Sequence, residues 1–314
     1  MKRFGYLFEK IVDIENIKLA HKNARRGKSK YREVKMVDAD IERYALEIKQ
    51  LLESGLYRTS EYSVIQKIDK GKVRDIYRLP YYPDRIVHHA IMQILEPIWK
   101  PTLINDTYQS IKGRGPHKAI KKLRRLIIRD GYRYYLKLDL AKYYPSIDNT
   151  ILKRVIRKKI KCGKTLELLD SIVDSCVGVP IGNYLSQYLG NIYLNELDQI
   201  GVRQGCKYFR YCDDIVAIAD DKNKLWKLLK LVVAVTTSYK LKIKWYYVVS
   251  IQGRSRLDYL GYCIHENKIL LRKSIKLRSK TGCIRALHSY VGWLRHCNGW
   301  NLTNKLRSIH GSSK

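Results

Sequence analysis

The sequence is poor in acidic residues and has no long apolar run. Its 29 Asp and Glu residues face 62 Lys and Arg, a net charge of +33 over 314 residues. This excess points to a polyanionic partner, most simply a nucleic acid. The basic residues are spread along the whole chain, which disfavours a membrane surface. No apolar stretch of about 18 residues and no apolar signal core occur, so we expect neither a membrane span nor export.

Cysteines are few and irregularly spaced. The chain has seven, an odd number, and no Cys-x-x-Cys spacing, so neither a disulfide framework nor a zinc knuckle is indicated. Free thiols are typical of a reducing compartment, and we expect a cytoplasmic protein. Internal repeats and low-complexity linkers are also missing. The length is sufficient for two or three subdomains with a real core.

What the chain does have is an adjacent acidic pair between two short β-prone runs. Tyr208-Phe209-Arg210 precedes Tyr211-Cys212-Asp213-Asp214, and Ile215-Val216-Ala217-Ile218 follows. The pattern predicts a β-hairpin with carboxylates at its tip. Adjacent carboxylates repel each other unless a divalent cation lies between them, as in phosphoryl-transfer sites. The alternative is a solvated acidic turn.

A third carboxylate lies upstream in a similar setting. Leu136-Lys137-Leu138-Asp139-Leu140 is an apolar strand that ends on Asp139. An Asp in such a strand is costly to bury without a partner. The alternative is a structural Asp that caps the next helix.

Spacing along the chain predicts an α+β fold. Runs of antiparallel strands with helices on one face fit this class. We expect helices over 38–54, 84–99, 116–129, 149–176, 185–196 and 221–236, and β segments over 62–68, 73–79, 136–140, 207–219, 240–250 and 257–264. The segments 62–68 and 73–79 flank the Gly-containing turn 69–72 and predict a hairpin.

Two basic loops are candidate nucleic-acid contacts. Arg25, Arg26 and Lys28 lie in a short cationic loop, and Lys112 and Arg114 lie in a Gly-rich one. Such loops suit phosphate contacts.

In order and spacing, these segments resemble the conserved motifs of bacterial reverse transcriptases. Asp139, followed five residues later by an aromatic, resembles motif A, and Tyr211–Asp214 resembles motif C. Leu257–Tyr262 is similar to motif E, the primer grip. Val73–Ala90 and Gly113–Ala119 look like two fingers blocks. The resemblance covers roughly residues 55 to 275.

The resemblance implies a right-hand polymerase with fingers, a palm of antiparallel sheet plus helices, and a short helical thumb. We expect an N-terminal basic helical region at 1–54 and fingers at 55–130. The palm would span 131–268, with a helical insert at 149–176. A short basic thumb or C-terminal region would follow at 269–314.

The implied enzyme is an RNA-directed DNA polymerase, a nucleotidyltransferase that uses dNTPs, template RNA and a primer or cDNA strand. It would use two Mg²⁺ ions, with Mn²⁺ as a substitute. Asp139 and Asp213 are the candidates to bridge both ions, with Asp214 as the third catalytic carboxylate and the Leu140 carbonyl as a further ligand. The lysine that many polymerases carry in motif D is not matched at its usual place, although Lys244 is near.

Further residues are expected to bind the nucleotide or the nucleic acid. In the resembling family, the aromatic at Tyr144 packs below the sugar and excludes a 2′-hydroxyl. Arg74 has a planar guanidinium suited to stacking on a base and holding phosphates. Gly182 permits close backbone approach to the templating pair. The complete set of nucleotide-binding candidates is Arg74, Tyr144, Ile181, Gly182 and Gln187; the additional nucleic-acid candidates are Tyr259, Gly261, Arg272 and Lys273.

Motif B indicates the subfamily. Ile181-Gly182-Asn183-Tyr184-Leu185-Ser186-Gln187 resembles the reverse transcriptases of diversity-generating retroelements, which are bacterial or phage-encoded. That group implies adenine-mutagenised cDNA copied from a template-repeat RNA, and a small basic oligomeric accessory protein. The short chain and the absence of a Val-Thr-Gly thumb motif disfavour group II intron and retron enzymes. A phage-defence reverse transcriptase is the alternative. A non-catalytic RNA-binding protein fits the three carboxylates less well.

Overall fold

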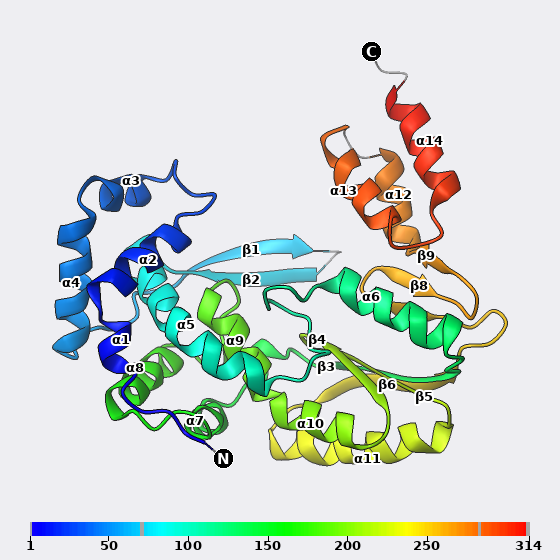
Figure 1. The fold of residues 1–314 in the computed structure, drawn as a ribbon, viewed down its shortest axis with the longest axis horizontal. Helices are drawn as coiled ribbons and strands as arrows, with labels where there is room; N and C mark the ends of the chain where they lie inside the picture. Colours follow the sequence, from blue (N-terminus) through cyan, green and yellow to red (C-terminus); the bar gives the residue numbers. More distant parts are fainter. Residues whose placement is uncertain (1, 70–71, 282–283, 312–314) are drawn as a thin grey trace. The chain divides into compact units, whose positions relative to one another are not determined.

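The computed structural model describes residues 2–69, 72–281 and 284–311, which form two compact units. The first unit comprises Met1–Ile104, Ala141–Leu197 and Val235–Lys242, and the second comprises Asn105–Leu140, Asp198–Ala234 and Ile243–Lys314. Each unit is therefore assembled from segments that are far apart in the sequence (Figure 1). The division into named fingers, palm and thumb regions stays a prediction.

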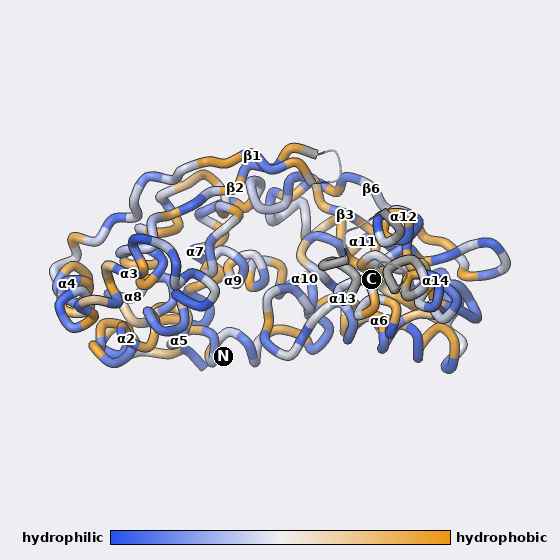
Figure 2. Tube along the Cα trace, turned by 90° about the horizontal axis from the view of Figure 1, so that it is seen from above, coloured by the Kyte–Doolittle hydropathy of each residue, from blue (hydrophilic) through white to orange (hydrophobic). Residues whose placement is uncertain are grey.

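The first unit is mainly helical. Its helices are α1 (Phe8–Ile11), α2 (Ile14–Ala24), α3 (Arg32–Ala39), α4 (Ile41–Glu53), α5 (Ile86–Trp99), α7 (Asn149–Arg157), α8 (Gly163–Asp174) and α9 (Tyr184–Tyr193). Along α2, α4 and α5, hydrophobic and hydrophilic residues alternate in short segments, as amphipathic helices require (Figure 2). The side chains of Asp13, Asp40 and Asp148 accept hydrogen bonds from backbone N–H groups at the starts of α2, α4 and α7.

The predicted hairpin of the first unit is confirmed. Strands β1 (Ser63–Asp69) and β2 (Lys72–Arg78) pair antiparallel, with Val64 opposite Tyr77 and Lys67 opposite Arg74. The expected turn at Lys70 and Gly71 lies outside the described residues.

The second unit is built on a four-stranded antiparallel sheet in the order β4-β5-β3-β6. Its strands are β3 (Tyr134–Leu140), β4 (Lys207–Tyr211), β5 (Asp214–Ala219) and β6 (Ile243–Ser250). Helices α10 (Asn195–Arg203) and α11 (Lys222–Ser238) run along one side of this sheet (Figure 1). The α+β class is thus confirmed.

On the other side of the sheet a hydrophobic cluster joins β3 and β5 to α6 (Pro116–Arg124) and a second, three-stranded sheet. The strands of that sheet are β7 (Leu257–Tyr259), β8 (Tyr262–Ile264) and β9 (Ile269–Leu271). Helices α12 (Lys273–Thr281), α13 (Ile284–Leu294) and α14 (Trp300–Gly311) follow. In the described ranges, no helix has the length and apolar character needed to cross a bilayer.

Two predicted elements are corrected. The segment 257–264 is two strands, because Leu260 and Gly261 have φ values of +47° and +86° and form a two-residue turn. Positive φ at both central residues defines a type I′ hairpin turn. The helix expected over 185–196 ends at Tyr193, and a separate helix, α10, begins at Asn195. The helical region expected over 149–176 consists of two helices, α7 and α8.

Candidate active site

The sheet of the second unit brings two predicted carboxylates together. Residues alternate across a strand, so Tyr135, Lys137 and Asp139 share one face of β3. The register pairs Asp139 with Asp214 on β5. On its other side, β3 pairs with β6 until a bulge between Asp139 and Leu140 shifts the register. Directly paired residues have Cβ atoms about 5 Å apart, so Asp139 and Asp214 form a cross-strand acidic pair.

The third carboxylate lies at the tip of the β4–β5 hairpin. Tyr211 pairs with Asp214, which leaves Cys212 and Asp213 as a two-residue turn. Cys212 has φ of +60°, a conformation that costs free energy for a residue other than glycine. The sequence-predicted hairpin with an acidic tip is therefore confirmed, and its turn has the positive φ at the first position that type II′ turns require.

The carboxylate of Asp214 is buried beside one lysine and two further carboxylates. Its Oδ1 atom is inaccessible and has no hydrogen-bond partner, and Lys137 Nζ is 3.6 Å away. Burial raises the pKa of Asp214 to about 7; Lys137 opposes this shift, and the charges of Asp213 and Asp139 add to it. Two further carboxylates beside Asp214 leave an excess of negative charge that Lys137 offsets only in part, and such an excess favours a bound cation.

Sequence reasoning missed the role of Lys137. Its side chain is only 7% exposed; Nζ donates to the carbonyl of Asp258 and lies 5.5 Å from the ring centroid of Trp245 and 5.9 Å from that of Tyr259. The signal was available, because a lysine inside an apolar strand needs a buried partner. Lys244 is a second cation of the site, with Nζ 3.5 Å from Asp139 Oδ2.

The carboxylates form a partial metal-ligand set. Within the described ranges, no three His, Cys, Asp or Glu side chains converge tightly enough to hold an ion without help. Mg²⁺ is commonly bound by one or two carboxylates, with substrate phosphates and waters as the remaining ligands. Asp139 paired with Asp214 fits that arrangement.

Tyr144 lies in the first unit and packs against α9. Its hydroxyl donates to Gln187 Oε1 at 3.1 Å, and its side chain is buried. A Cβ atom at Gly190 would lie 2.9 Å from Tyr144 Cε1, so the absence of a side chain at Gly190 lets the ring approach the helix. The structure thus brings together two predicted nucleotide-binding residues, Tyr144 and Gln187.

Ile181 and Gly182 contact the hairpin that carries Arg74. The Ile181 carbonyl accepts a hydrogen bond from Tyr77 N at 2.8 Å. At Gly182, where φ is +132°, a Cβ atom would lie 2.4 Å from the Tyr77 carbonyl oxygen. Gly182 therefore approaches β2 closely, and its approach to the templating pair stays a prediction.

The expected nucleic-acid contacts divide into exposed and internally paired residues. Arg26, Lys112 and Lys273 are exposed. Arg25 pairs with Asp38 at 2.9 Å, and Arg272 donates to Asp258. The remaining candidates are Lys28, whose Nζ lies over Tyr31, and Arg114, which donates to the Thr107 carbonyl.

Two of these expectations are corrected by burial. The ring of Tyr259 is fully buried in the core of the second unit and has no surface for a base. Gly261 is buried too, and a Cβ atom there would lie 2.6 Å from the Trp293 ring. Both residues shape the β7–β8 turn and are not direct contacts in this conformation.

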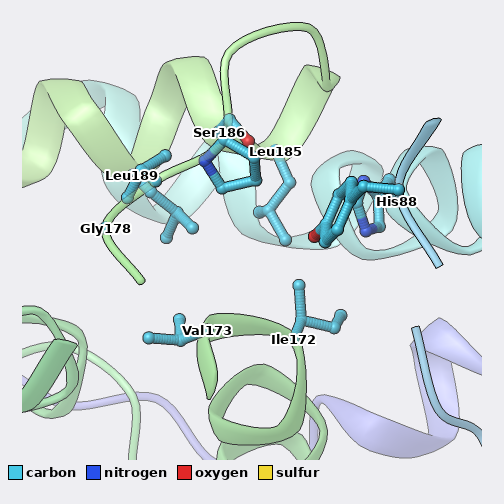
Figure 3. Close-up of a pocket in the computed structure, with 10 residues that line it drawn as sticks. His88, Ile172, Val173, Gly178, Leu185, Ser186 and Leu189 are labelled. Atoms are coloured by element: carbon cyan, nitrogen blue, oxygen red, sulfur yellow. The ribbon is translucent and has the colours of Figure 1, made fainter. Parts of the chain in front are cut away.

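A small internal cavity in the first unit is not a nucleotide site. It measures about 10 Å³ and is lined by His88, Ser186 and Gly178, among others (Figure 3). That volume accommodates about one water molecule. Burial lowers the pKa of His88 to about 4, so the imidazole is neutral.

Comparison with known proteins identifies the site's relatives. The family profile described as reverse transcriptase (RNA-dependent DNA polymerase) matches residues 65–264, which include all three carboxylates. Protein YkfC of Escherichia coli (strain K12) is 29% identical over 143 residues, which is 41% of this chain and 37% of YkfC. Group II intron-encoded protein LtrA of Lactococcus lactis subsp. cremoris is 28% identical over 157 residues, covering 46% of this chain and 26% of LtrA.

Another relative aligns over more of its own length. Retron Ec73 reverse transcriptase of Escherichia coli is 25% identical over 227 residues, covering 66% of this chain and 70% of the relative. Among solved structures, apo telomerase from Candida tropicalis has a TM-score of 0.55 at 12% identity, over 75% of this chain and 52% of that one. At this identity the similarity shows the polymerase fold.

Proposed function

Because the chain belongs to the reverse transcriptase (RNA-dependent DNA polymerase) family, we propose that it synthesises DNA on an RNA template. The observation that carries the proposal is the pairing of Asp139 with Asp214, with Asp213 on the adjoining turn, inside the matched residues. The chain spans little more than a third of YkfC and about a quarter of LtrA. The proposal for this chain therefore rests on its own residues and not on the activities of these relatives.

In this proposal, different residues have different roles in nucleotide addition. Asp139, Asp213 and Asp214, with the Leu140 carbonyl, would hold two Mg²⁺ ions, which when bound supply charge stabilisation for the attacking 3′-hydroxyl and the leaving pyrophosphate. Lys137 holds the Asp214 carboxylate from its buried side, and Lys244 provides positive charge beside Asp139. Tyr144 would exclude the 2′-hydroxyl, and Arg74 would contact the incoming nucleotide.

The test is primer extension by the purified chain on an RNA template. The proposal predicts template-directed incorporation of dNTPs that stops when divalent metal is chelated and resumes when Mg²⁺ or Mn²⁺ is restored. A chain that binds the primer–template but adds no nucleotide under any metal condition would contradict it.

We further propose the biological role of a diversity-generating retroelement. The support is motif B, in which Ile181 stands where the Gln-Gly reverse transcriptases have a polar residue. An apolar side chain cannot hydrogen-bond to a base or a strand backbone, and one lost contact reduces discrimination by about 1–3 kcal/mol. The role implies a template-repeat RNA, adenine-directed errors, a small basic accessory protein and a cytoplasmic setting. The alternative role is that of a phage-defence reverse transcriptase, which has the same chemistry and a related motif B.

A group II intron role is a separate candidate, favoured by the similarity to LtrA. Sequencing of cDNA separates the candidates. For the retroelement role, errors should concentrate at template adenines and decline in Ile181→Gln. An active enzyme whose errors are spread evenly over the four bases would contradict that role. Specific binding to a group II intron RNA, with no template repeat beside the gene, would favour the intron role.

A further inference from the structure

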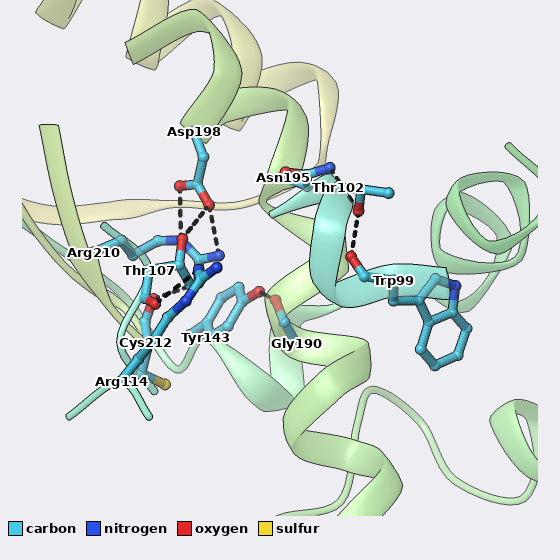
Figure 4. Close-up of polar contacts among 10 residues, drawn as sticks. All are labelled: Trp99, Thr102, Thr107, Arg114, Tyr143, Gly190, Asn195, Asp198, Arg210 and Cys212. Carbon is cyan, nitrogen blue, oxygen red and sulfur yellow. Dashed lines mark hydrogen bonds and ion pairs between the residues drawn. The ribbon is translucent and has the colours of Figure 1, made fainter. Parts of the chain in front are cut away.

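The second unit contains a fully buried ion pair outside the acidic site. Arg210 on β4 and Asp198 on α10 both have side chains that are 0% exposed. The guanidinium donates from Nε to Asp198 Oδ1 at 2.7 Å and from Nη2 to Oδ2 at 2.7 Å, a bidentate geometry (Figure 4). The hydroxyl of Thr107 donates to Oδ2 at 3.1 Å. The pair is thus completely desolvated and well hydrogen-bonded.

The third nitrogen of the guanidinium contacts the Cys212–Asp213 turn between β4 and β5. Arg210 Nη1 donates to the carbonyl oxygen of Cys212 at 3.2 Å. Cys212 is the residue with φ of +60°, and Asp213 follows it directly. A strained backbone conformation persists only where its surroundings hold it. The guanidinium is such a restraint, because Asp198 fixes its plane and its third nitrogen fixes the carbonyl.

The strand that carries Arg210 is held on its outer edge as well. Tyr108 N donates to the Arg210 carbonyl, and Arg210 N donates to the Asp106 carbonyl. Gly201 lets α10 approach β4, because a Cβ atom there would lie 2.3 Å from the Tyr208 ring. The backbone of β4 and the helix that carries Asp198 are therefore fixed independently of the ion pair.

We propose that Arg210 is a positioning residue that, braced by Asp198, sets the Cys212 peptide and thereby orients Asp213 for metal binding. The inference rests on the proposed polymerase function. It assigns a catalytic consequence to a side chain on the face of the sheet opposite the carboxylates. A buried pair that only stabilises the fold would have no such consequence.

The two possibilities are separated by replacing the pair with apolar residues. Asp198→Leu, Arg210→Met and Thr107→Val in one chain remove both charges and the Thr107 hydroxyl that donates to Asp198. Such replacements of buried ion pairs are often neutral or stabilising. Arg210→Lys is the second variant, since one ammonium keeps the charge but cannot reproduce the three-armed contact. Lys224→Met is the control, because Lys224 forms only an exposed ion pair with Asp220.

Three quantities are measured: the melting temperature, the affinity for primer–template, and single-turnover incorporation at saturating dNTP with its amplitude and its Mg²⁺ dependence. The proposal predicts a folded triple variant that binds primer–template within about twofold of the wild type. Its single-turnover rate should fall at least tenfold at unchanged amplitude, and it should need several-fold more Mg²⁺ for half-maximal rate. Arg210→Lys should show the same pattern, and Lys224→Met should match the wild type.

A folded triple variant with the wild-type rate and Mg²⁺ dependence would overturn the proposal. If the triple variant does not fold, Arg210→Lys decides: a loss of amplitude alone, at unchanged rate, means a structural role and also overturns it. Failure of the proposed function is distinguishable, because then the wild-type chain and Lys224→Met would be inactive too.

Discussion

Asp214 carries much of the electrostatic cost of the site. Its pKa is raised to about 7 in the folded chain, whereas its ordinary value is 3.8. The folded chain therefore binds more protons than the unfolded chain between these values. By linkage, Asp214 lowers the free energy of unfolding progressively as pH rises from about 4 to 7, and the loss is complete above pH 7. The buried carboxylate of Asp214 thus lowers stability at neutral pH, and the proposed cation would offset this loss.

Asp214→Asn should stabilise the metal-free chain at high pH. The amide has no charge to desolvate, so at pH 8 in chelator we expect the melting temperature to rise by on the order of 2 °C or more. The gain should shrink toward pH 5, where Asp214 is protonated. Thermal unfolding followed by circular dichroism measures both values. Asp220→Asn, on an exposed carboxylate, is the control, and a lower melting temperature for Asp214→Asn at pH 8 would contradict the account.

Tyr144 is held by contacts that suit a rigid wall. Its hydroxyl bonds to Gln187, and its ring lies against Gly190. Tyr144→Ala should open space beside the sugar and admit ribonucleotides, with the selectivity for dNTP over rNTP falling at least tenfold. Tyr144→Phe is the control, since it keeps the ring and loses only the hydroxyl. Competition between dNTP and rNTP in primer extension gives the ratio, and unchanged selectivity in the Ala variant would make Tyr144 a core residue only.

At the scale of elements, the β1–β2 hairpin is attached to the motif B turn through a glycine. The Tyr77 N–H bonds to the Ile181 carbonyl, and Gly182 leaves no room for a side chain against the Tyr77 carbonyl. The hairpin also carries Arg74, the proposed contact to the incoming nucleotide. The position of the β1–β2 hairpin, and with it the affinity for the incoming nucleotide, should therefore depend on this attachment.

Gly182→Ala should weaken nucleotide binding. The added methyl group would lie 2.4 Å from a backbone oxygen, and φ of +132° is unfavourable for alanine, so the hairpin must shift. We expect the KM for dNTP to rise about tenfold or more, with primer–template affinity within twofold. Gly205→Ala is the matched control, with positive φ but open space around its Cβ position. An equal effect of both substitutions would point to general strain and not to hairpin attachment.

How far the sequence predicts these elements depends on how local their determinants are. The Tyr211–Asp214 hairpin follows from two β-prone runs and an acidic turn, all within a dozen residues. The break at Leu260 was missed because its turn has Leu, and not Asn or Asp, before Gly261, which weakens the usual type I′ signal. The contact of Gly182 with Tyr77 was beyond sequence reasoning, since the two residues are brought together only by the fold.

The same limit applies to the candidate site. The three carboxylates were found because each interrupts an apolar strand or turn in an unusual way. Arg210 and Asp198 carried no such recognisable spacing, and only the packing of α10 on β4 shows that they form a buried pair. Tyr259 was misassigned, because a motif fixes where a residue lies along the chain but not whether its ring faces solvent.

At the scale of the whole molecule, we expect the net charge of +33 to dominate binding to RNA. Each phosphate that Lys or Arg neutralises releases a condensed counterion, and log K then falls linearly with log salt. We expect a slope of at least about −4 for primer–template binding between 50 and 200 mM salt. Fluorescence anisotropy measures it. A nearly flat slope would mean that the basic residues are not the RNA-binding surface.

The central claim is that the acidic cross-strand pair of the second unit catalyses RNA-templated DNA synthesis. The most direct measurement is single-nucleotide incorporation on an RNA template by the wild type, Asp139→Asn and the control Asp220→Asn, with primer–template affinity measured in parallel. The account predicts wild-type activity in Asp220→Asn, and at least a thousandfold loss in Asp139→Asn with affinity unchanged within a few-fold. Incorporation by Asp139→Asn at the wild-type rate would contradict it.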